Sequence, residues 1–307
     1  MSQFDLVILG GGSGGYAAAL RGAQLGLSVA LIEADKVGGT CLHRGCIPTK
    51  ALLHSAEIAD GAREGSHFGV KSTFDGIDMA GVNAYKDGVI NKLHKGLSGL
   101  VKSRNITYIE GYGKLVAKDT VEVNGTRYTG KNVILATGSY AKTLPGLEID
   151  GEKIITSDHG TKMSYVPKSV IVLGGGVIGC EFASVWKSFG SDVTIIEGLP
   201  HLVALEDESS SKLLERAFRK RGINFELGVR FKSHRVDSKG VTVTLEDGRE
   251  FTADVLLVSV GRGPVTDGVG YQEVGIAMDR GYITVDDHCR TNIPGIFAVG
   301  DIIPTLQ

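Results

Sequence analysis

A glycine-rich pattern that occurs twice limits the fold of this chain more than any other feature. In each copy, an apolar run of strand length leads into three glycines with the spacing G-x-G-x-x-G, then a helical segment, then a second apolar run. The second run ends in an acid, Glu33 or Glu197, which lies 18 residues after the last glycine in both copies. This order predicts a strand–helix–strand unit that binds a dinucleotide. The glycines are Gly10, Gly12 and Gly15 in the first copy and Gly174, Gly176 and Gly179 in the second.

The residue types in each copy suit a dinucleotide. Glycine permits a tight turn and lets the backbone approach a pyrophosphate, and the helix N-terminus supplies N–H donors. The acid is placed to accept hydrogen bonds from ribose hydroxyls. Two such sites indicate electron transfer between two dinucleotides, for which flavin and nicotinamide are the natural pair. Glu197 favours NAD over NADP, because its carboxylate repels a 2′-phosphate and residues 198–208 contain no arginine to hold one.

The duplication continues beyond the glycine turns. Hairpin signals at 124–125 (Asn-Gly) and 247–248 (Asp-Gly) each lead to an apolar strand that stops at a glycine, Gly138 or Gly261. The two hairpin turns lie 123 positions apart, as do the two glycines that end the strands after them. We therefore predict an α/β fold with two tandem Rossmann-like dinucleotide-binding domains, the second inserted in the first.

The repeat also predicts domain limits. Residues 1–146 and 276–307 are assigned to an FAD-binding domain, and residues 147–275 to an NAD-binding domain. Residues 78–104 carry apolar side chains at helical spacing and predict a long packing helix.

Two cysteines, Cys41 and Cys46, lie in the stretch GGTCLHRGCIPTK directly after the first unit. Pro48 suits the first turn of a helix, which places Cys46 near a helix N-terminus where a thiolate is stabilised, and Lys50 adds positive charge. We interpret the pair as a redox-active dithiol/disulfide. Zinc binding and two inert cysteines are the alternatives; zinc is disfavoured because the only local histidines are 43 and 54, and no metal site is predicted. Cys180 and Cys289 are isolated and are expected to be small core residues.

The composition argues against nucleic-acid-binding, secreted disulfide-rich and membrane-spanning classes of protein. The chain has 33 basic and 35 acidic residues, a net charge of −2, which gives no reason to expect a nucleic-acid or membrane-surface partner. Four cysteines in 307 residues are not a secreted disulfide framework, and no apolar run approaches the roughly 18 residues of a membrane span. The N-terminus is interpreted as a first strand rather than a signal peptide, so a cytoplasmic location is expected.

These motifs together resemble the FAD-dependent pyridine nucleotide–disulfide oxidoreductases. The resemblance rests on GGTCLHRGCIPTK with GGGSGGYAAALRGAQLG, LATGS, GGGVIGCEFASVW, SVGR and IFAVGD, in this order, from residue 4 to the end. Within the family the chain is most similar to members that oxidise dihydrolipoamide with NAD.

The resemblance implies a role for each matching position. Cys41 is implied as the thiol that exchanges with substrate and Cys46 as the thiol next to the flavin. Lys50 is implied beside the flavin ring, paired with Glu181, which lies between nicotinamide and flavin. The implied FAD-binding residues are Gly10, Gly12, Ser13, Gly14, Gly15, Glu33, Gly39, Thr40, Lys50, Gly113, Thr137, Gly138, Ser139 and Asp301. The implied NAD-binding residues are Gly174, Gly176, Val177, Ile178, Gly179, Glu181, Glu197 and Gly261.

The resemblance also implies a reaction and partners. Dihydrolipoamide, free or on the lipoyl domains of 2-oxo acid dehydrogenase complexes, reduces the Cys41–Cys46 disulfide, and the electrons pass through FAD to NAD⁺. The full-length form is implied to be a homodimer.

The chain departs from the family pattern in two places. The family base is a histidine followed by a glutamate in a C-terminal interface domain, which is expected to be absent because the chain ends at AVGDIIPTLQ. The nearest mimic, His54 with Glu57, is expected to be a surface pair on a helix. Loss of lipoamide turnover is therefore expected, with NADH-driven dye reduction retained if FAD stays bound. His43 and Arg44, between the cysteines, are unusual for the family. They either shift the pKa of the thiols through their charge or only border solvent, and we expect the second.

Two kinds of alternative remain open. The chain could be another flavin disulfide reductase, for glutathione, mycothione or mercuric ion, although glutathione reductases favour NADP, against which Glu197 argues. It could also be a non-catalytic binding fragment. A flavin absorption band that shifts on adding a dithiol distinguishes the enzyme from the fragment.

Overall fold

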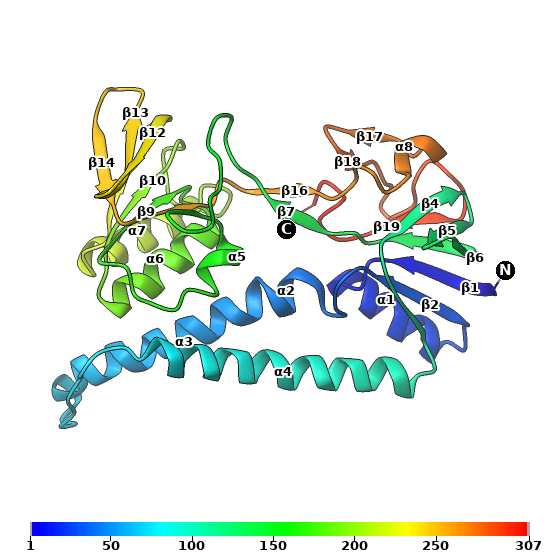
Figure 1. Ribbon diagram of the computed structural model, residues 1–307, viewed down its shortest axis with the longest axis horizontal. Coiled ribbons are helices and arrows are strands. Elements are labelled where there is room, and N and C mark those ends of the chain that lie inside the picture. The colour runs from blue at the N-terminus through cyan, green and yellow to red at the C-terminus, as the bar shows by residue number, and fades with distance from the viewer. Residues whose placement is uncertain (1, 306–307) are drawn as a thin grey trace. The chain divides into compact units, whose positions relative to one another are not determined.

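The computed structural model describes residues 2–305, which divide into two compact units (Figure 1). Unit 1 comprises Met1–His43, Ile90–Tyr140 and Arg262–Gln307; unit 2 comprises Arg44–Val89 and Ala141–Gly261. The domain ranges drawn from the repeat remain predictions. Residues 44–89 pack with unit 2 here, whereas the predicted FAD-binding range includes them.

Unit 1 is built on a mixed sheet with the strand order β3-β2-β1-β6-β5-β4, and one more strand, β19, pairs with β6. Strands β1, β2, β3, β6 and β19 pair in parallel, while β4 and β5 join β6 as an antiparallel meander. The strands are β1 (Ser2–Leu9), β2 (Val29–Glu33), β3 (Thr107–Glu110), β4 (Gly113–Ala117), β5 (Thr120–Val123), β6 (Thr126–Leu135) and β19 (Ile296–Ala298).

Strand β1 is apolar on both faces because each face meets its own core. Leu6 and Ile8 pack in one cluster with Ala19 of helix α1 (Ser13–Gln24) and Val101 of helix α4 (Met79–Ser103). The alternate residues of β1 belong to a second cluster, which includes the meander. A strand covered on both faces reads as a continuous apolar run, which is how the sequence presents it. Helix α4 confirms the predicted long helix within one residue at each end.

Short elements complete unit 1. Asn124 and Gly125 both have positive φ, 49° and 77°, at the turn between β5 and β6, as an Asn-Gly hairpin requires. The remaining elements are α2 (Gly39–His43), β7 (Ser139–Ala141, whose last residue belongs to unit 2), β16 (Arg262–Pro264), α8 (Tyr271–Val274), β17 (Met278–Asp279) and β18 (Tyr282–Ile283).

Unit 2 repeats this plan. Its parallel sheet has the order β11-β10-β9-β15-β8, and an antiparallel sheet β12-β13-β14 accompanies it. The strands are β8 (Ile154–Ile155), β9 (Ser169–Leu173), β10 (Asp192–Ile196), β11 (Asn224–Glu226), β12 (Phe231–Asp237), β13 (Gly240–Leu245), β14 (Glu250–Ala253) and β15 (Val255–Val258). The helices are α3 (Cys46–Glu64), η1 (Gly65–Phe68), α5 (Ser157–Gly160), α6 (Val177–Phe189) and α7 (Glu208–Lys220).

The copies differ where the meander meets the parallel sheet. Unit 1 uses one ten-residue strand, β6, for both purposes, whereas unit 2 divides the equivalent stretch into β14 and β15 at Asp254. The Asp254 carboxylate accepts the amides of Lys168 and Ser169, at 2.8 and 3.1 Å, just where β9 begins. The predicted α/β class with two Rossmann-type units is confirmed. Within residues 2–305, no helix has both the length and the apolar character that a membrane crossing requires.

Candidate functional site

The first glycine turn leaves no room for a side chain at Gly10 or Gly15. Gly10 has φ +108°, and a Cβ placed on it would collide with the carbonyl oxygen of Ala136, at the end of the neighbouring strand β6. A Cβ on Gly15 would collide with the carbonyl of Gly10. Strand β1, its turn and α1 therefore approach one another at backbone distance, which is the geometry that brings a pyrophosphate to a helix N-terminus.

Glu33 braces this turn from the end of β2. One carboxylate oxygen accepts the amide of Gly11 at 2.6 Å, and the other accepts the amide of Asp35 at 2.9 Å. Each oxygen retains a lone pair, so the carboxylate can still accept from ribose hydroxyls. Glu33 thus has a structural function in addition to the binding function predicted for it.

The N-terminus of α1 faces an open turn. Gly12 is the N-cap and makes no side-chain capping bond, so Ser13 and Gly14 present first-turn amides for an anion. Gly39 has φ +59°, and a Cβ on it would lie 2.6 Å from the Cα of Gly12. The segment that continues into Thr40 and Cys41 therefore begins directly against the phosphate turn, and these residues fit the FAD that the motifs imply.

Polar groups cluster after β6 in unit 1. The hydroxyl of Ser139 donates to the carboxylate of Asp301 and accepts from Nε of Arg262 at 2.7 Å. Thr137 donates to the carbonyl of Val265 at 2.6 Å, and its hydroxyl lies 3.0 Å from that of Tyr271. Burial raises the pKa of Tyr271 above its usual range. Two of the predicted residues, Ser139 and Asp301, are thus brought together.

Sequence reasoning missed Arg262 and Tyr271. The repeat holds a signal for Arg262, which lies 123 residues after Ser139 and is its equivalent in the second copy.

Gly138 has φ +76° and open space around it. Gly113 lies in the sheet packing, since a Cβ on it would be 2.5 Å from a methyl of Leu9, so its role in FAD binding remains a prediction.

The second glycine turn copies the first in detail. Gly174 has φ +106°, and a Cβ there would collide with the carbonyl of Ser259; one on Gly179 would collide with the carbonyl of Gly174. Glu197 accepts the amides of Gly175 at 2.5 Å and Leu199 at 2.7 Å, as Glu33 accepts those of Gly11 and Asp35.

The rim of this turn is open. Gly176 is the N-cap of α6 without a side-chain cap, and the next residue, Val177, is 53% exposed. Ile178 is half-buried, and Gly261 has φ +107° with nothing close to it. The turn fits the pyrophosphate and ribose of NAD. Ser259, which was not predicted, donates to the carbonyls of Leu173 and Gly174 and ties the turn to β15.

The cysteine segment forms two helices. Cys41 lies in α2 and is half-buried, whereas Cys46 is exposed and opens α3 after the N-cap Gly45, as predicted. Lys50, one turn along α3, places its Nζ 2.7 Å from Oε1 of Glu181 in α6, with side-chain exposures of 57% and 22%. The ion pair implied by the family resemblance is therefore present, while the roles of both residues at a flavin remain predictions.

For the other cysteines and histidines, some of the expected environments are found in the structure and others are not. Cys180 is buried, as expected, and burial raises its pKa to about 12. Cys289 was expected in the core, but it is half-buried in a turn with φ 60°. His54 and Glu57 form the expected surface pair at 3.2 Å. The expectation that His43 only borders solvent is wrong, because it is half-buried, bonds the Val37 carbonyl at 3.0 Å and meets the ring of His94 edge-on.

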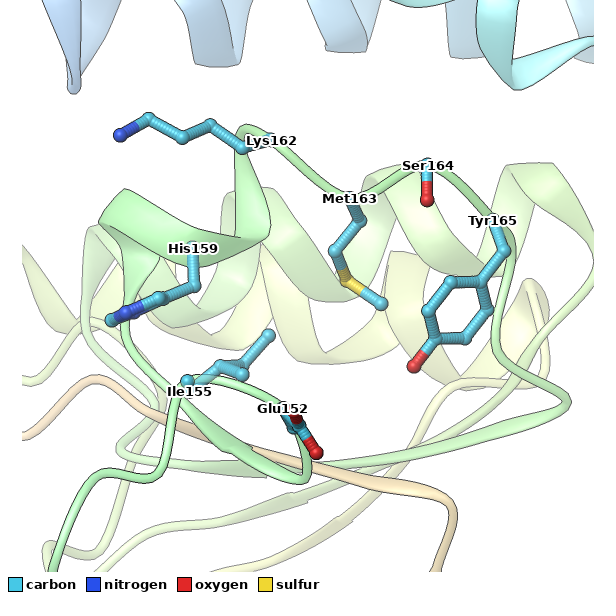
Figure 2. A pocket seen from close by; sticks show the side chains of 8 residues that line it. Glu152, Ile155, His159, Lys162, Met163, Ser164 and Tyr165 are labelled. Carbon is cyan, nitrogen blue, oxygen red and sulfur yellow. The ribbon is translucent and has the colours of Figure 1, made fainter.

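A pocket of about 430 Å³ in unit 2 contains none of the predicted site residues (Figure 2). It lies beside α5 and the segment that follows, with His159, Lys162 and Tyr165 in its lining. His159 is already engaged in capping α5 through Thr156. Among residues 2–305, no group of three or more His, Cys, Asp or Glu side chains is placed to hold a metal ion.

Comparison with known proteins agrees with this geometry. The family model for pyridine nucleotide-disulphide oxidoreductases matches residues 4–307. The dihydrolipoyl dehydrogenase of Cupriavidus necator is 42% identical over 98% of this chain and 68% of its own length. The crystal structure of LpdA from Mycobacterium tuberculosis superposes with a TM-score of 0.91 at 30% identity, covering all of this chain and 69% of that one. The HOCl-induced flavoprotein disulfide reductase RclA from Escherichia coli, as its Cu(II) complex, gives 0.88 at 28% identity, covering all of this chain and 68% of that one.

Proposed function

Since the chain belongs to the pyridine nucleotide-disulphide oxidoreductase family, whose dihydrolipoyl dehydrogenases use FAD and NAD, we propose that the full-length protein oxidises dihydrolipoamide with NAD⁺ through Cys41 and Cys46, and that residues 1–307 alone turn dihydrolipoamide over poorly. The chain spans about two thirds of the length of the relatives it matches. For the full-length protein, the proposal includes a cytoplasmic homodimer that acts on lipoyl domains of 2-oxo acid dehydrogenase complexes.

The Lys50–Glu181 ion pair carries the proposal. Lys50 lies on the helix that Cys46 opens, and Glu181 lies in the second turn of the helix that begins at the second glycine turn. One ion pair thus joins the helix of a thiol to the helix of a dinucleotide turn. A binding protein without redox chemistry has no need for this connection.

The chain supplies the thiol chemistry with its own residues. A substrate thiolate attacks Sγ of Cys41, the Cys41–Cys46 bond breaks, and Cys46 leaves as a thiolate next to the helix N-terminus. The second substrate thiol then displaces Cys41, so that the substrate becomes a disulfide and the protein a dithiol. Bound FAD supplies the two-electron relay between this dithiol and NAD⁺. The net change reoxidises the dithiol, forms NADH and releases one proton.

The cofactors are recognised by distinct residues. Glu33 and the Gly10–Gly15 turn would hold the adenosine and pyrophosphate of FAD, with Asp301 toward its ribityl chain. Glu197 and the Gly174–Gly179 turn would hold those of NAD. Lys50 would keep positive charge beside the flavin, and Glu181 would orient it.

A set of absorption spectra tests the proposal. Purified full-length protein should be yellow, and both NADH and dihydrolipoamide should bleach its flavin band. Cys46→Ser should abolish bleaching by the dithiol and preserve bleaching by NADH, while Cys289→Ser, a control that removes a thiol outside the motif, should behave like the original protein. A colourless protein, or a Cys46→Ser variant that is still reduced by the dithiol, would contradict the proposal.

The likeness to RclA favours a second candidate, a reductase of another disulfide substrate. The same spectra separate the two candidates when dihydrolipoamide is compared with glutathione and other small thiols. Reduction by dihydrolipoamide at least tenfold faster than by any of the others supports the first candidate.

A further inference from the structure

We propose that Asp60, with Ser188 and Arg221, positions α3 on α6 so that Lys50 meets Glu181. The inference deepens the proposed function, because it rests on Lys50 and Glu181 acting where electrons pass between nicotinamide and flavin. Asp60 lies in the last turns of α3, far along the helix from Cys46, and touches neither cysteine motif nor glycine turn.

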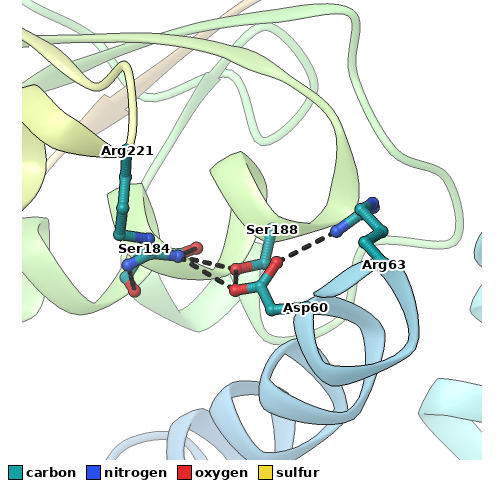
Figure 3. A network of polar contacts seen from close by, with 5 residues as sticks. All are labelled: Asp60, Arg63, Ser184, Ser188 and Arg221. Atoms are coloured by element: carbon teal, nitrogen blue, oxygen red, sulfur yellow. Dashed lines mark hydrogen bonds and ion pairs between the residues drawn. The ribbon is translucent and has the colours of Figure 1, made fainter. Parts of the chain in front are cut away.

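The contacts of Asp60 cross from one helix to the other. Its Oδ2 accepts from the hydroxyl of Ser188 at 2.6 Å and lies 3.4 Å from a guanidinium nitrogen of Arg221 (Figure 3). Arg221, at the end of α7, donates to the hydroxyl of Ser184 at 2.6 Å and to that of Ser188 at 2.7 Å. A carboxylate on α3 is thereby held by two side chains fixed to α6.

The Asp60 network and the Lys50–Glu181 pair fix the same helix pair at two places. Lys50 and Asp60 are ten residues apart on α3, and Glu181 and Ser188 are seven apart on α6, in the same order. Two directional contacts at separate points determine the register of one helix on the other, whereas a single contact would leave α3 free to pivot.

The surface between these points is apolar and partly formed by small side chains. Leu52 and Ala56 of α3 are buried in the same cluster as Phe182, Val185 and Trp186 of α6. Apolar burial holds the helices together but is non-directional, so it tolerates a small slide that polar contacts do not.

Exposure indicates a positioning role rather than a large contribution to stability. The side chains of Asp60 and Arg221 are 37% and 34% exposed. Ion pairs with this much solvent contribute little to the free energy of unfolding. Misplacement of a reacting group by about 1 Å, by contrast, can lower a rate by about a hundredfold.

Asp60→Ala is the test variant and Arg63→Ala its matched control. Arg63 donates to Asp60 at 3.0 Å from the same helix and its guanidinium lies over the ring of Phe74. Among residues 2–305 it makes no hydrogen bond or ion pair with α6, so its loss removes an ion pair of Asp60 but no polar contact between the two helices. Asp60→Ala should slow flavin reduction by NADH about tenfold and speed amide hydrogen exchange at residues 50–56 in the FAD-free protein. Arg63→Ala should leave both unchanged, and equal behaviour of the two variants would overturn the inference.

Ser188→Ala provides a second variant should Asp60→Ala fold poorly; it should reproduce both effects, and unchanged rate and exchange would refute the role. Coupling to the ion pair distinguishes positioning from general support. In a Glu181→Gln background, Asp60→Ala should slow flavin reduction less than twofold further, while its shift in Tm stays the same. A full tenfold loss in that background would overturn the inference.

Failure of NADH to reduce the unmutated protein would count against the proposed function, whereas the hydrogen-exchange result would still decide the role of Asp60.

Discussion

Arg262 Nε lies 2.7 Å from the hydroxyl of Ser139, and the two residues occupy equivalent positions, 123 residues apart, in the two copies of the repeat. The same guanidinium also donates to the Ser139 carbonyl at 2.8 Å. Since the Ser139 hydroxyl donates onward to Asp301, Arg262 helps to orient a residue that is assigned to the cofactor of unit 1, to which all three residues belong.

Ser139→Ala should therefore weaken FAD binding about tenfold, because it removes the acceptor of Arg262 and the donor to Asp301, and hydrogen bonds to charged groups each contribute about 1.5–3 kcal/mol. Release of flavin fluorescence on dilution measures the change. Lys114→Met, which breaks the exposed ion pair with Glu273 in the same unit, is the control and should retain FAD as before. An unchanged FAD affinity in Ser139→Ala would show that Asp301 is oriented by other means.

Gly174 and Gly176 should respond to alanine in opposite ways. Gly174→Ala places a methyl against the Ser259 carbonyl at φ +106° and should cost about 2 kcal/mol or more of unfolding free energy. Gly176 has φ −72° and open space, so Gly176→Ala should fold normally and instead weaken NADH binding, since its methyl stands where a pyrophosphate would approach. Thermal denaturation and NADH titration separate these outcomes, and normal NADH affinity in Gly176→Ala would contradict the assigned site.

Local patterns explain why much of this fold can be read from sequence. Glycine spacing, apolar runs and the Asn-Gly turn at 124–125 each depend on neighbours within about 30 residues, and all of them form the expected elements. Cys46 at a helix start follows from Pro48 and the helical segment after it.

The features that were not predicted from the sequence depend on contacts between residues that are far apart along the chain. Packing of α3 on α6 joins residues more than 100 positions apart, and no periodicity in either helix names its partner. Arg262 and Tyr271 acquire their roles only when the chain returns to Ser139 and Thr137. The expected solvent border at His43 failed for the same reason, since His94 lies on a different helix.

Glu197 should control the choice between NADH and NADPH. Glu197→Gln removes the negative charge but keeps an oxygen for a backbone amide, so the preference for NADH, measured as the ratio of kcat/KM values, should fall about tenfold. Glu33→Gln, the same change in the equivalent bracing acid of the first copy, should lower FAD retention and leave that ratio unchanged. An equal change of this ratio in both variants would mean that Glu197 stabilises the turn without contacting the ribose.

Cys180 should resist alkylation in the folded protein and make folding less stable in alkali. Burial raises its pKa to about 12, so the folded thiol stays neutral at pH 9, whereas Cys46 of the reduced protein is exposed to the reagent. The unfolded thiol ionises near its ordinary pKa of about 8.5. Between these values the unfolded state binds fewer protons than the folded state, so the contribution of Cys180 to stability is complete below about pH 8.5 and is lost as the pH rises toward 12.

Urea denaturation at pH 7.5 and pH 10 measures this effect when the original protein is compared with Cys180→Ala. The difference in stability between the two pH values should be smaller in Cys180→Ala, because alanine has no proton to lose. Cys289→Ala, which removes a half-buried thiol from a turn, is the control and should keep the pH dependence of the original protein. Rapid labelling of Cys180 by iodoacetamide in the native state, or the same pH dependence in all three proteins, would show that this thiol is not held neutral by the core around α6.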